Sequence, residues 1–306
     1  MKSISNKQLI IIAAFCFVIL SGSLFWFLTA RKPKKVATPA QVPVATTTAE
    51  TPQETEVSIA TQKTIGLSVE GRKIESYTFG NGTTRLVFIG GIHGGYEWNS
   101  VLLAYQLIDY LKQNPDFIPK NLTVAVIPAA NPDGVFKIVG KEGRFSLSDV
   151  PAGTNEAGRL NARAVDLNRN FDCGWKASGV WQSKTVSGGT SPFSEPETAA
   201  IKKFILEDKA AAVVFWHSKS GTVYGSSCGD DMLPETAAIM GVYAKAAGYA
   251  MAPTFNQYPV SGDATDWLDS IGIPAITAEL KTHENIEWNQ NFAGIQALFK
   301  YYGNKK

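Results

Sequence analysis

Hydrophobic and polar positions divide the chain into three stretches with different patterns. Residues 9–30 form an uncharged, mostly apolar run, and no aromatic residue occurs between Arg31 and Ser76. From about Ile65 onward, short apolar runs alternate with segments whose apolar residues recur at helical spacing. These patterns predict an N-terminal membrane segment, a connecting stalk and one folded domain over residues 65–306.

The folded part shows the alternation of strands and helices that is typical of α/β proteins. Continuous apolar strands between helices indicate a mixed, mostly parallel twisted sheet that helices cover on both faces. The expected strands are Ile65–Glu70, Lys73–Phe79, Arg85–Ile89, Leu122–Ile127, Ala211–Trp216 and Ala275–Leu280. The expected helices are Glu97–Leu111, Glu195–Leu206, Pro234–Ala247 and Ile286–Tyr302.

The apolar run at residues 9–30 is long enough to cross a membrane. At a rise of about 1.5 Å per residue, a helix of this length matches a hydrocarbon core of roughly 30 Å. A tail of residues 1–8 with Lys2 and Lys7 precedes it, and no good small-residue cleavage site follows. We expect an uncleaved transmembrane signal anchor. A signal peptide cleaved near Ala30 and a buried core helix are the alternatives.

Residues 31–64 have the composition of a basic membrane flank followed by a flexible stalk. Residues 36–64 contain eight Thr and three Pro. Basic residues after the apolar run would, by the positive-inside rule, place the folded domain in the cytoplasm. A stalk is instead most useful for holding a domain away from an outer membrane face. We therefore expect an extracytoplasmic, membrane-anchored domain, which would be secreted if the N-terminal segment is cleaved.

Composition narrows the classes of function. With 306 residues, of which 44% are hydrophobic and 18% charged, and with three Cys, the chain is neither disordered nor disulfide-dense. The net charge of +2 is uneven, because residues 1–64 hold seven Lys/Arg and three Glu. The remainder is slightly acidic, so nothing supports a nucleic-acid partner. A metal site would have to draw on only three His.

Three predicted strands carry chemically active side chains at or near their ends. His93 and His217 follow two apolar strands, and Glu279 lies within a third. Because ligands of open α/β sheets bind beyond the carboxyl ends of the strands, we expect these three residues to share one site.

A glycine-rich turn over residues 90–97 places His93 and Glu97 four residues apart. Glycines let the backbone and a substrate approach such a site closely. Together with His217, these side chains form a two-histidine, one-carboxylate set that suits zinc and leaves a position open. His283 competes as the third ligand. Glu287 stands where an H-E-x-x-H clamp needs its second His, so we interpret His283 as a loop residue near the site mouth.

These residues and several later motifs resemble the zinc carboxypeptidase family over roughly residues 65–306. The family commonly has two residues between the first His and Glu, whereas this chain has three. The elements that match in order are the His93/Glu97 pair, Asn131-Pro132-Asp133-Gly134, Asp166-Leu167-Asn168-Arg169-Asn170-Phe171, His217-Ser218, Tyr258 with Asp266-Trp267, and Glu279. The resemblance implies a metallocarboxypeptidase that holds one zinc ion through His93, Glu97 and His217.

The resemblance also implies two catalytic residues. Glu279 would be the general base. Arg159 would stabilise the oxyanion, with Arg163 as its local rival. Asp133 and Asp166 are expected to brace turns or the ligand shell.

Four further residues would bind the substrate. Asn168 and Arg169 would hold its terminal carboxylate, because a planar guanidinium can pair with a carboxylate through two hydrogen bonds. Tyr258 would close over the substrate and donate a hydrogen bond. Thr265 would line the side-chain pocket. Neither Thr265 nor its neighbour Ala264 is charged, which gives no support for a pocket dedicated to terminal Lys or Arg, although nearby carboxylates leave a basic side chain open.

The short domain and the expected anchor look closest to bacterial cell-wall members of the family, which makes peptidoglycan stem peptides a candidate substrate. A zinc amidohydrolase that removes acyl groups from small amino acids is the alternative enzyme. A membrane-anchored binding module with a dead site is the alternative outside enzymes. We expect a monomeric catalytic domain in which Cys173 and Cys228 either pair or remain two buried thiols.

Overall fold

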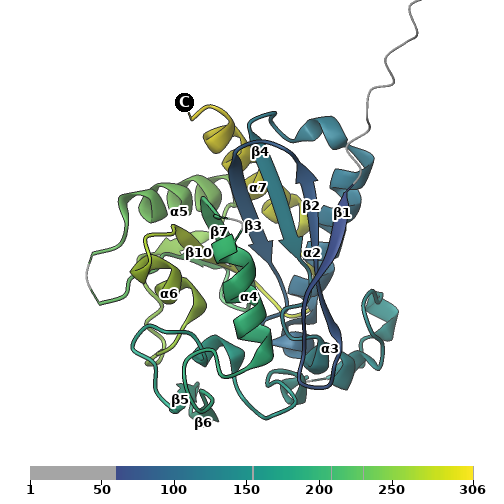
Figure 1. Cartoon of the computed structure of the whole chain (residues 1–306), viewed down its shortest axis with the longest axis vertical. Coiled ribbons are helices and arrows are strands. Elements are labelled where there is room, and N and C mark those ends of the chain that lie inside the picture. Colours follow the sequence, from purple (N-terminus) through teal and green to yellow (C-terminus); the bar gives the residue numbers. More distant parts are fainter. Residues whose placement is uncertain (1–59, 154, 208, 230, 306) are drawn as a thin grey trace, which may run out of the picture. The chain divides into compact units, whose positions relative to one another are not determined.

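The computed structural model of the chain describes residues 60–153, 155–207, 209–229 and 231–305 (Figure 1). The expected membrane segment at residues 9–30, and most of the expected stalk, lie outside them. Within these ranges, no helix combines the length and the apolarity needed to span a bilayer. The first strand begins at Thr61, four residues before the expected domain boundary, because Thr61 pairs with Thr78 of the next strand.

An eight-stranded mixed sheet forms the centre of the fold. Its strands are β1 (Thr61–Leu67), β2 (Lys73–Gly80), β3 (Thr84–Ile89), β4 (Leu122–Ile127), β7 (Ala212–Ser218), β8 (Thr222–Tyr224), β9 (Ala250–Ala252) and β10 (Ala275–Leu280). They lie in the order β1-β2-β4-β3-β7-β10-β8-β9, and β4, β3, β7 and β10 run parallel. A separate hairpin pairs β5 (Ser178–Trp181) with β6 (Lys184–Ser187). The expected mixed, mostly parallel sheet is confirmed.

Helices cover both faces of the sheet, as expected (Figure 1). Alternate side chains of β3 show this directly. Leu86 and Phe88 join one buried cluster with residues of α2, α5 and α7, whereas Val87 and Ile89 join a second cluster with residues of α4 and α6. The helices are α2 (Trp98–Gln113), α3 (Pro132–Val139), α4 (Pro196–Glu207), α5 (Pro234–Ala247), α6 (Ala264–Ser270) and α7 (Trp288–Gly303).

Two short helices and four short strands were not expected from the sequence: α3, α6, β5, β6, β8 and β9. Each of the two helices begins after a side chain that accepts a backbone hydrogen bond. Asn131 accepts from the N–H of Gly134, and Asp263 accepts from the N–H groups of Thr265 and Asp266. The expected strand Ile65–Glu70 ends earlier, at Leu67, because residues 68–71 form a turn.

The parallel strands deliver the candidate residues to one edge of the sheet. Strand β7 ends in His217 and Ser218, and the neighbouring β10 places Glu279 directly opposite His217. Strand β3 lies on the other side of β7 and continues into the turn that carries His93. The three expected strand ends therefore meet, as the position of ligand sites in α/β sheets requires.

Three glycines allow the turn after β3 to pack against its neighbours. A Cβ atom on Gly94 would lie 2.5 Å from the carbonyl oxygen of Gly158, and one on Gly134 would lie 2.3 Å from the same oxygen. Gly94 also has a φ of +48°, a conformation that other residues rarely adopt. The backbone around His93 and Glu97 is therefore held by contacts that tolerate no side chain.

Replacing Gly134 with Ala should destabilise the fold through the clash with Gly158. We expect the free energy of unfolding, measured in urea, to fall by about 1–3 kcal/mol. The matched control is Gly241→Ala in the middle of α5, where a Cβ would meet nothing within 4 Å. That change should stabilise the protein by about 0.5–1 kcal/mol. Equal stability of the two variants would contradict the packing described for Gly134.

Candidate metal centre

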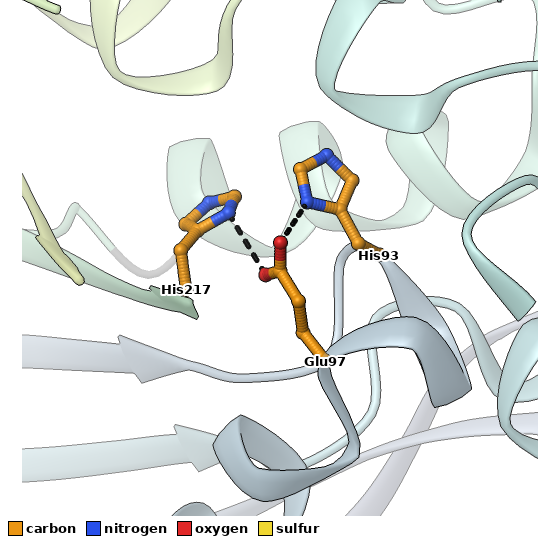
Figure 2. Close-up of side chains that lie close together, drawn as sticks. All are labelled: His93, Glu97 and His217. Carbon is orange, nitrogen blue, oxygen red and sulfur yellow. Dashed lines mark hydrogen bonds and ion pairs between the residues drawn. The ribbon is translucent and has the colours of Figure 1, made fainter. Parts of the chain in front are cut away.

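His93, Glu97 and His217 converge on one point, as Figure 2 shows. Nδ1 of His93 lies 2.8 Å from Glu97 Oε1, and Nδ1 of His217 lies 3.1 Å from Glu97 Oε2. The ligand atoms that these residues offer all lie within 4.8 Å of one another. Each side chain is at most 5% exposed.

The donor set and its burial both fit a zinc ion. Two imidazole nitrogens and one carboxylate are the ligands of many catalytic zinc sites. Glu97 Oε2 is buried and has no hydrogen-bond partner, although it faces His217 at ion-pair distance. A buried carboxylate oxygen without a hydrogen bond is costly unless another charge satisfies it. A cation held by the three side chains would supply that charge.

A single turn of 3-10 helix brings His93 and Glu97 together across their four-residue spacing. This turn, η1 (Gly94–Glu97), follows His93 directly and leads into α2. Ser100 of α2 holds both ends of the turn, because its hydroxyl donates to the carbonyl of Glu97 and accepts from the N–H of Gly91. The extra residue of this chain is therefore absorbed in the turn, and both side chains still point to the same place.

Electrostatics keep the carboxylate of the triad ionised. Burial opposes ionisation, but the adjacent His93 and His217 hold the pKa of Glu97 well below its ordinary value. In turn, burial disfavours protonation of His217, while Glu97 raises its pKa overall. The ionisation of Glu97 and the protonation of His217 therefore favour each other.

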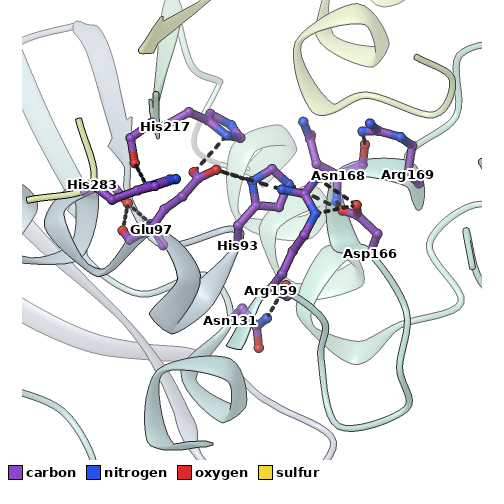
Figure 3. A network of polar contacts seen from close by, with 12 residues as sticks. His93, Glu97, Asn131, Arg159, Asp166, Asn168, Arg169, His217 and His283 are labelled. Carbon is purple, nitrogen blue, oxygen red and sulfur yellow. Dashed lines mark hydrogen bonds and ion pairs between the residues drawn. The ribbon is translucent and has the colours of Figure 1, made fainter. Parts of the chain in front are cut away.

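Asp166 orients two of the neighbouring groups (Figure 3). Its Oδ2 accepts hydrogen bonds from Nε and Nη2 of Arg159, at 3.0 and 2.8 Å. Its Oδ1 lies 3.4 Å from Nε2 of His93, an ion-pair distance without a well-aligned hydrogen bond. Although burial opposes ionisation, Arg159 and then His93 hold the pKa of Asp166 well below its usual range. Asp166 therefore braces the ligand shell, the role expected for it.

Arg159, rather than Arg163, lies beside the three candidate metal ligands. Arg159 is 2% exposed, and its Nη1 is 3.9 Å from Glu97 Oε1. Its guanidinium also lies 4.5 Å from the ring centre of Trp181 in the β5–β6 hairpin. The side chain of Arg163 is 54% exposed and lies 3.6 Å from a carboxylate oxygen of Glu195.

Asn168 and Arg169 lie in a second 3-10 turn, η5 (Leu167–Arg169), with their polar groups held in place. The amide of Asn168 donates to Asp263 Oδ2 and accepts from the N–H of Ala264. The guanidinium of Arg169 donates to the backbone carbonyls of Asn168 and Val180, and it makes no ion pair with a described carboxylate.

A cavity of about 480 Å³ joins these groups. Its lining includes His93, Arg159, Asn168, Arg169, His217, Tyr258, Thr265 and Glu279, which are all the predicted site residues except Glu97. Glu279 keeps part of its surface open to the cavity. The surrounding protein nevertheless raises the pKa of its carboxyl to about 8 through burial, and the charge of Glu97 acts in the same direction. Tyr258 is half-buried and packs edge-on against Phe255.

A disulfide joins Cys173 and Cys228, one of the two outcomes left open by the sequence. Cys173 follows the Asn168-Arg169 turn, and its carbonyl accepts from the N–H of Gly262. Cys228 follows Gly225, another residue of the cavity wall, and its N–H donates to Asp269. The bond therefore ties together segments that surround the cavity.

His283 lies beside the triad but outside it. Its Nδ1 is 2.7 Å from the hydroxyl of Ser218, and its ring lies 4.6 Å from that of Tyr96. This placement agrees with its interpretation as a loop residue near the site. Sequence reasoning missed Tyr96 and Trp181, whose rings pack edge-on at 5.2 Å beside Arg159, since a tryptophan in a short hairpin gives no signal of its partner.

Known proteins share both the sequence pattern and the fold. Residues 47–301 match the sequence profile of the zinc carboxypeptidase family. Carboxypeptidase B of Helicoverpa zea is 28% identical over 249 residues, which cover 71% of this chain and 56% of that protein. Carboxypeptidase O of Bos taurus is 28% identical over 260 residues, which cover 75% of this chain and 66% of that protein. The chain thus spans less than two thirds of either relative.

Two solved structures have a similar fold. Bovine thrombin-activatable fibrinolysis inhibitor, in complex with tick carboxypeptidase inhibitor, gives a TM-score of 0.65 at 19% identity and covers 79% of this chain and 90% of its own. Murein-tripeptide amidase from Escherichia coli O157 gives a TM-score of 0.57 at 22% identity and covers 78% of this chain and 91% of its own. With a family profile that spans most of the sequence, and with His93, Glu97 and His217 gathered at the edge of this sheet, the chain belongs to the zinc carboxypeptidase family.

Proposed function

We propose that this chain is a zinc metallocarboxypeptidase, which hydrolyses an amide bond next to a free C-terminal carboxylate. The observation that carries the proposal is the guanidinium of Arg169, which is 2% exposed and lacks an acidic partner among the described residues. It borders the same cavity as His93, His217 and Glu279. A buried cation is costly without an anion, and the carboxylate of a substrate would provide one.

The chemistry needs a metal, a base and a cation near the scissile bond. A zinc ion held by His93, Glu97 and His217 would polarise the scissile carbonyl and lower the pKa of a water molecule. Glu279 takes the proton of the attacking water and passes it to the leaving amine. Burial, and then the charge of Glu97, raise the pKa of this carboxyl, which makes the carboxylate a stronger proton acceptor. Arg159, fixed by Asp166, donates to the developing oxyanion.

The remaining residues hold the substrate. Arg169 and the free amide N–H of Asn168 bind the terminal carboxylate. Hydrogen bonds to backbone carbonyls hold Arg169 in place, and a hydrogen bond to Asp263 holds Asn168, so both groups are oriented before the substrate arrives. Tyr258 donates its hydroxyl hydrogen to the substrate, and its position at the cavity supports this role. Thr265 forms part of the wall that meets the terminal side chain.

For the natural substrate we propose the stem peptides of peptidoglycan. The fold likeness to murein-tripeptide amidase supports this class of substrate without singling out a bond. Incubation with purified sacculi and with a protein-derived peptide of similar length tests it. We expect amino acids to be released from the sacculi, and release from the protein-derived peptide alone would contradict the proposal.

Two variants should distinguish the residues that bind zinc from the residue that acts as the base. His217→Gln removes a ligand, so we expect zinc content, measured by elemental analysis, to fall far below one ion per chain. Glu279→Gln leaves the three ligands intact, so it should retain zinc while kcat falls by about 100-fold or more.

Two matched controls sharpen this test. His283→Gln removes the neighbouring histidine, and Glu284→Gln removes an exposed carboxylate near it. Both should keep zinc, and Glu284→Gln should keep its activity. Loss of zinc from His283→Gln with retention in His217→Gln would reverse the ligand assignment, and a fully active Glu279→Gln would rule out Glu279 as the base.

Arg169→Gln should remove the recognition of the free carboxylate. Loss of a buried charge-paired contact predicts that kcat/KM for a peptide with a free C-terminus falls by about 100-fold. Arg163→Gln is the control, because it removes the same charge at the surface. If the parent protein cleaves a C-terminally amidated peptide as well as the free acid, the carboxypeptidase assignment fails and an endopeptidase or deacylase takes its place.

A further inference from the structure

The β5–β6 hairpin contacts both arginines of the cavity. The backbone carbonyl of Val180 accepts hydrogen bonds from Nη2 of Arg169 at 2.9 Å and from its Nε at 3.3 Å. The next residue, Trp181, places its ring centre 4.5 Å from the guanidinium carbon of Arg159. Two adjacent residues of one strand therefore contact the two cations that would meet the substrate.

Asp166 holds the guanidinium of Arg159 at a single point. Nε and Nη2 of the arginine both donate to the same oxygen, Asp166 Oδ2, at 3.0 and 2.8 Å. Nη1 takes part in neither bond and lies 3.9 Å from Glu97 Oε1. Two donors that share one acceptor leave the guanidinium plane able to tilt about that oxygen. A tilted donor makes a weaker hydrogen bond to an oxyanion, so a second contact is needed to fix the plane.

Trp181 supplies that contact. It is buried, and its ring packs edge-on against the ring of Tyr96, whose centre lies 5.8 Å from the guanidinium carbon of Arg159. An aromatic ring attracts a cation that lies over its face, and its flat surface resists tilting of the guanidinium. The N–H of Asp166 donates to the carbonyl of Ser187 in β6 at 2.9 Å. The ring and the carboxylate that hold Arg159 are therefore joined through the backbone of the hairpin.

We infer that Trp181 is a positioning residue, which holds the guanidinium of Arg159 at the angle needed to donate to the oxyanion. This inference rests on the proposed function, in which Arg159 meets the oxyanion and Arg169 the terminal carboxylate. The oxyanion develops only as the reaction proceeds, so loss of the Trp181 ring should lower kcat and leave KM nearly unchanged. Arg169 keeps its partner in such a variant, because the carbonyl of Val180 belongs to the backbone.

The first test compares two replacements of the same ring in hydrolysis of a peptide with a free C-terminus. Trp181→Leu removes the aromatic face, and we expect kcat to fall by about tenfold while KM stays within about twofold of the parent value. Trp181→Phe keeps an aromatic face and should recover most of the lost kcat. Equal kcat in the two variants would overturn the inference. Trp181→Met also lacks a ring and replaces Trp181→Leu if the latter does not fold.

Inhibitor binding measures the same effect without turnover. A phosphonate peptide carries a tetrahedral group with a negatively charged oxygen, whereas the amino acid released from the substrate carries only the terminal carboxylate. In Trp181→Leu the inhibition constant of the phosphonate should rise by about tenfold, and that of the amino acid should stay at the parent value. Equal weakening of both would indicate a general loss of structure and contradict the inference. Thr185→Ala, an exposed change opposite Val180 in the hairpin, is the control and should alter neither constant.

A double-mutant cycle shows whether Trp181 acts through Arg159. If it does, adding Trp181→Leu to Arg159→Gln should not weaken binding of the phosphonate any further. A further tenfold loss in that background would overturn the inference, and so would a parent-like kcat in Trp181→Leu, while both leave the carboxypeptidase assignment intact. Failure of the parent protein to hydrolyse any peptide with a free C-terminus would instead overturn the proposed function itself.

Discussion

The carboxylate of Glu97, shared between two imidazoles, is the interaction around which the site is built. One oxygen faces His93 at 2.8 Å and the other faces His217 at 3.1 Å. The contact with His93 lies within one turn, whereas the contact with His217 joins distant segments, because His217 comes from the end of β7 and Glu97 from the turn after β3. Burying these three polar side chains together is costly unless a cation compensates the charge of the carboxylate. Holding the three side chains together also requires the segments that carry them to lie close to one another.

The backbone meets that requirement with small residues and short helices. Gly94, Gly134 and Gly158 let three segments approach within distances that exclude a Cβ atom. Asp166 then links the ligand shell to Arg159, and Asp263 links α6 to Asn168. The Cys173–Cys228 disulfide joins the segment after η5 to the segment after β8. Groups that would act on substrate are therefore held in place by neighbouring side chains, which is how preorganised sites keep their geometry.

The sequence predicted the fold class and the triad because both depend on strong local signals. Strands such as Leu122–Ile127 are continuous apolar runs, the long helices have periodic apolar positions, and histidines at strand ends are rare enough to be noticed. Short elements were missed because α3 and α6 rest on single capping side chains. Trp181 was not placed in the site because only tertiary packing brings it to Arg159. Asp266 was named from its motif with Tyr258, and it does border the cavity.

The proposed chemistry depends on which side chains bind the metal. Crystals of the zinc-loaded protein, measured on both sides of the zinc absorption edge, locate the ion by its anomalous signal. The account predicts one strong peak in contact with His93, Glu97 and His217, with Glu279 and Arg159 facing it across the cavity. A peak bound by His283, or one that leaves Glu97 unliganded, would contradict it.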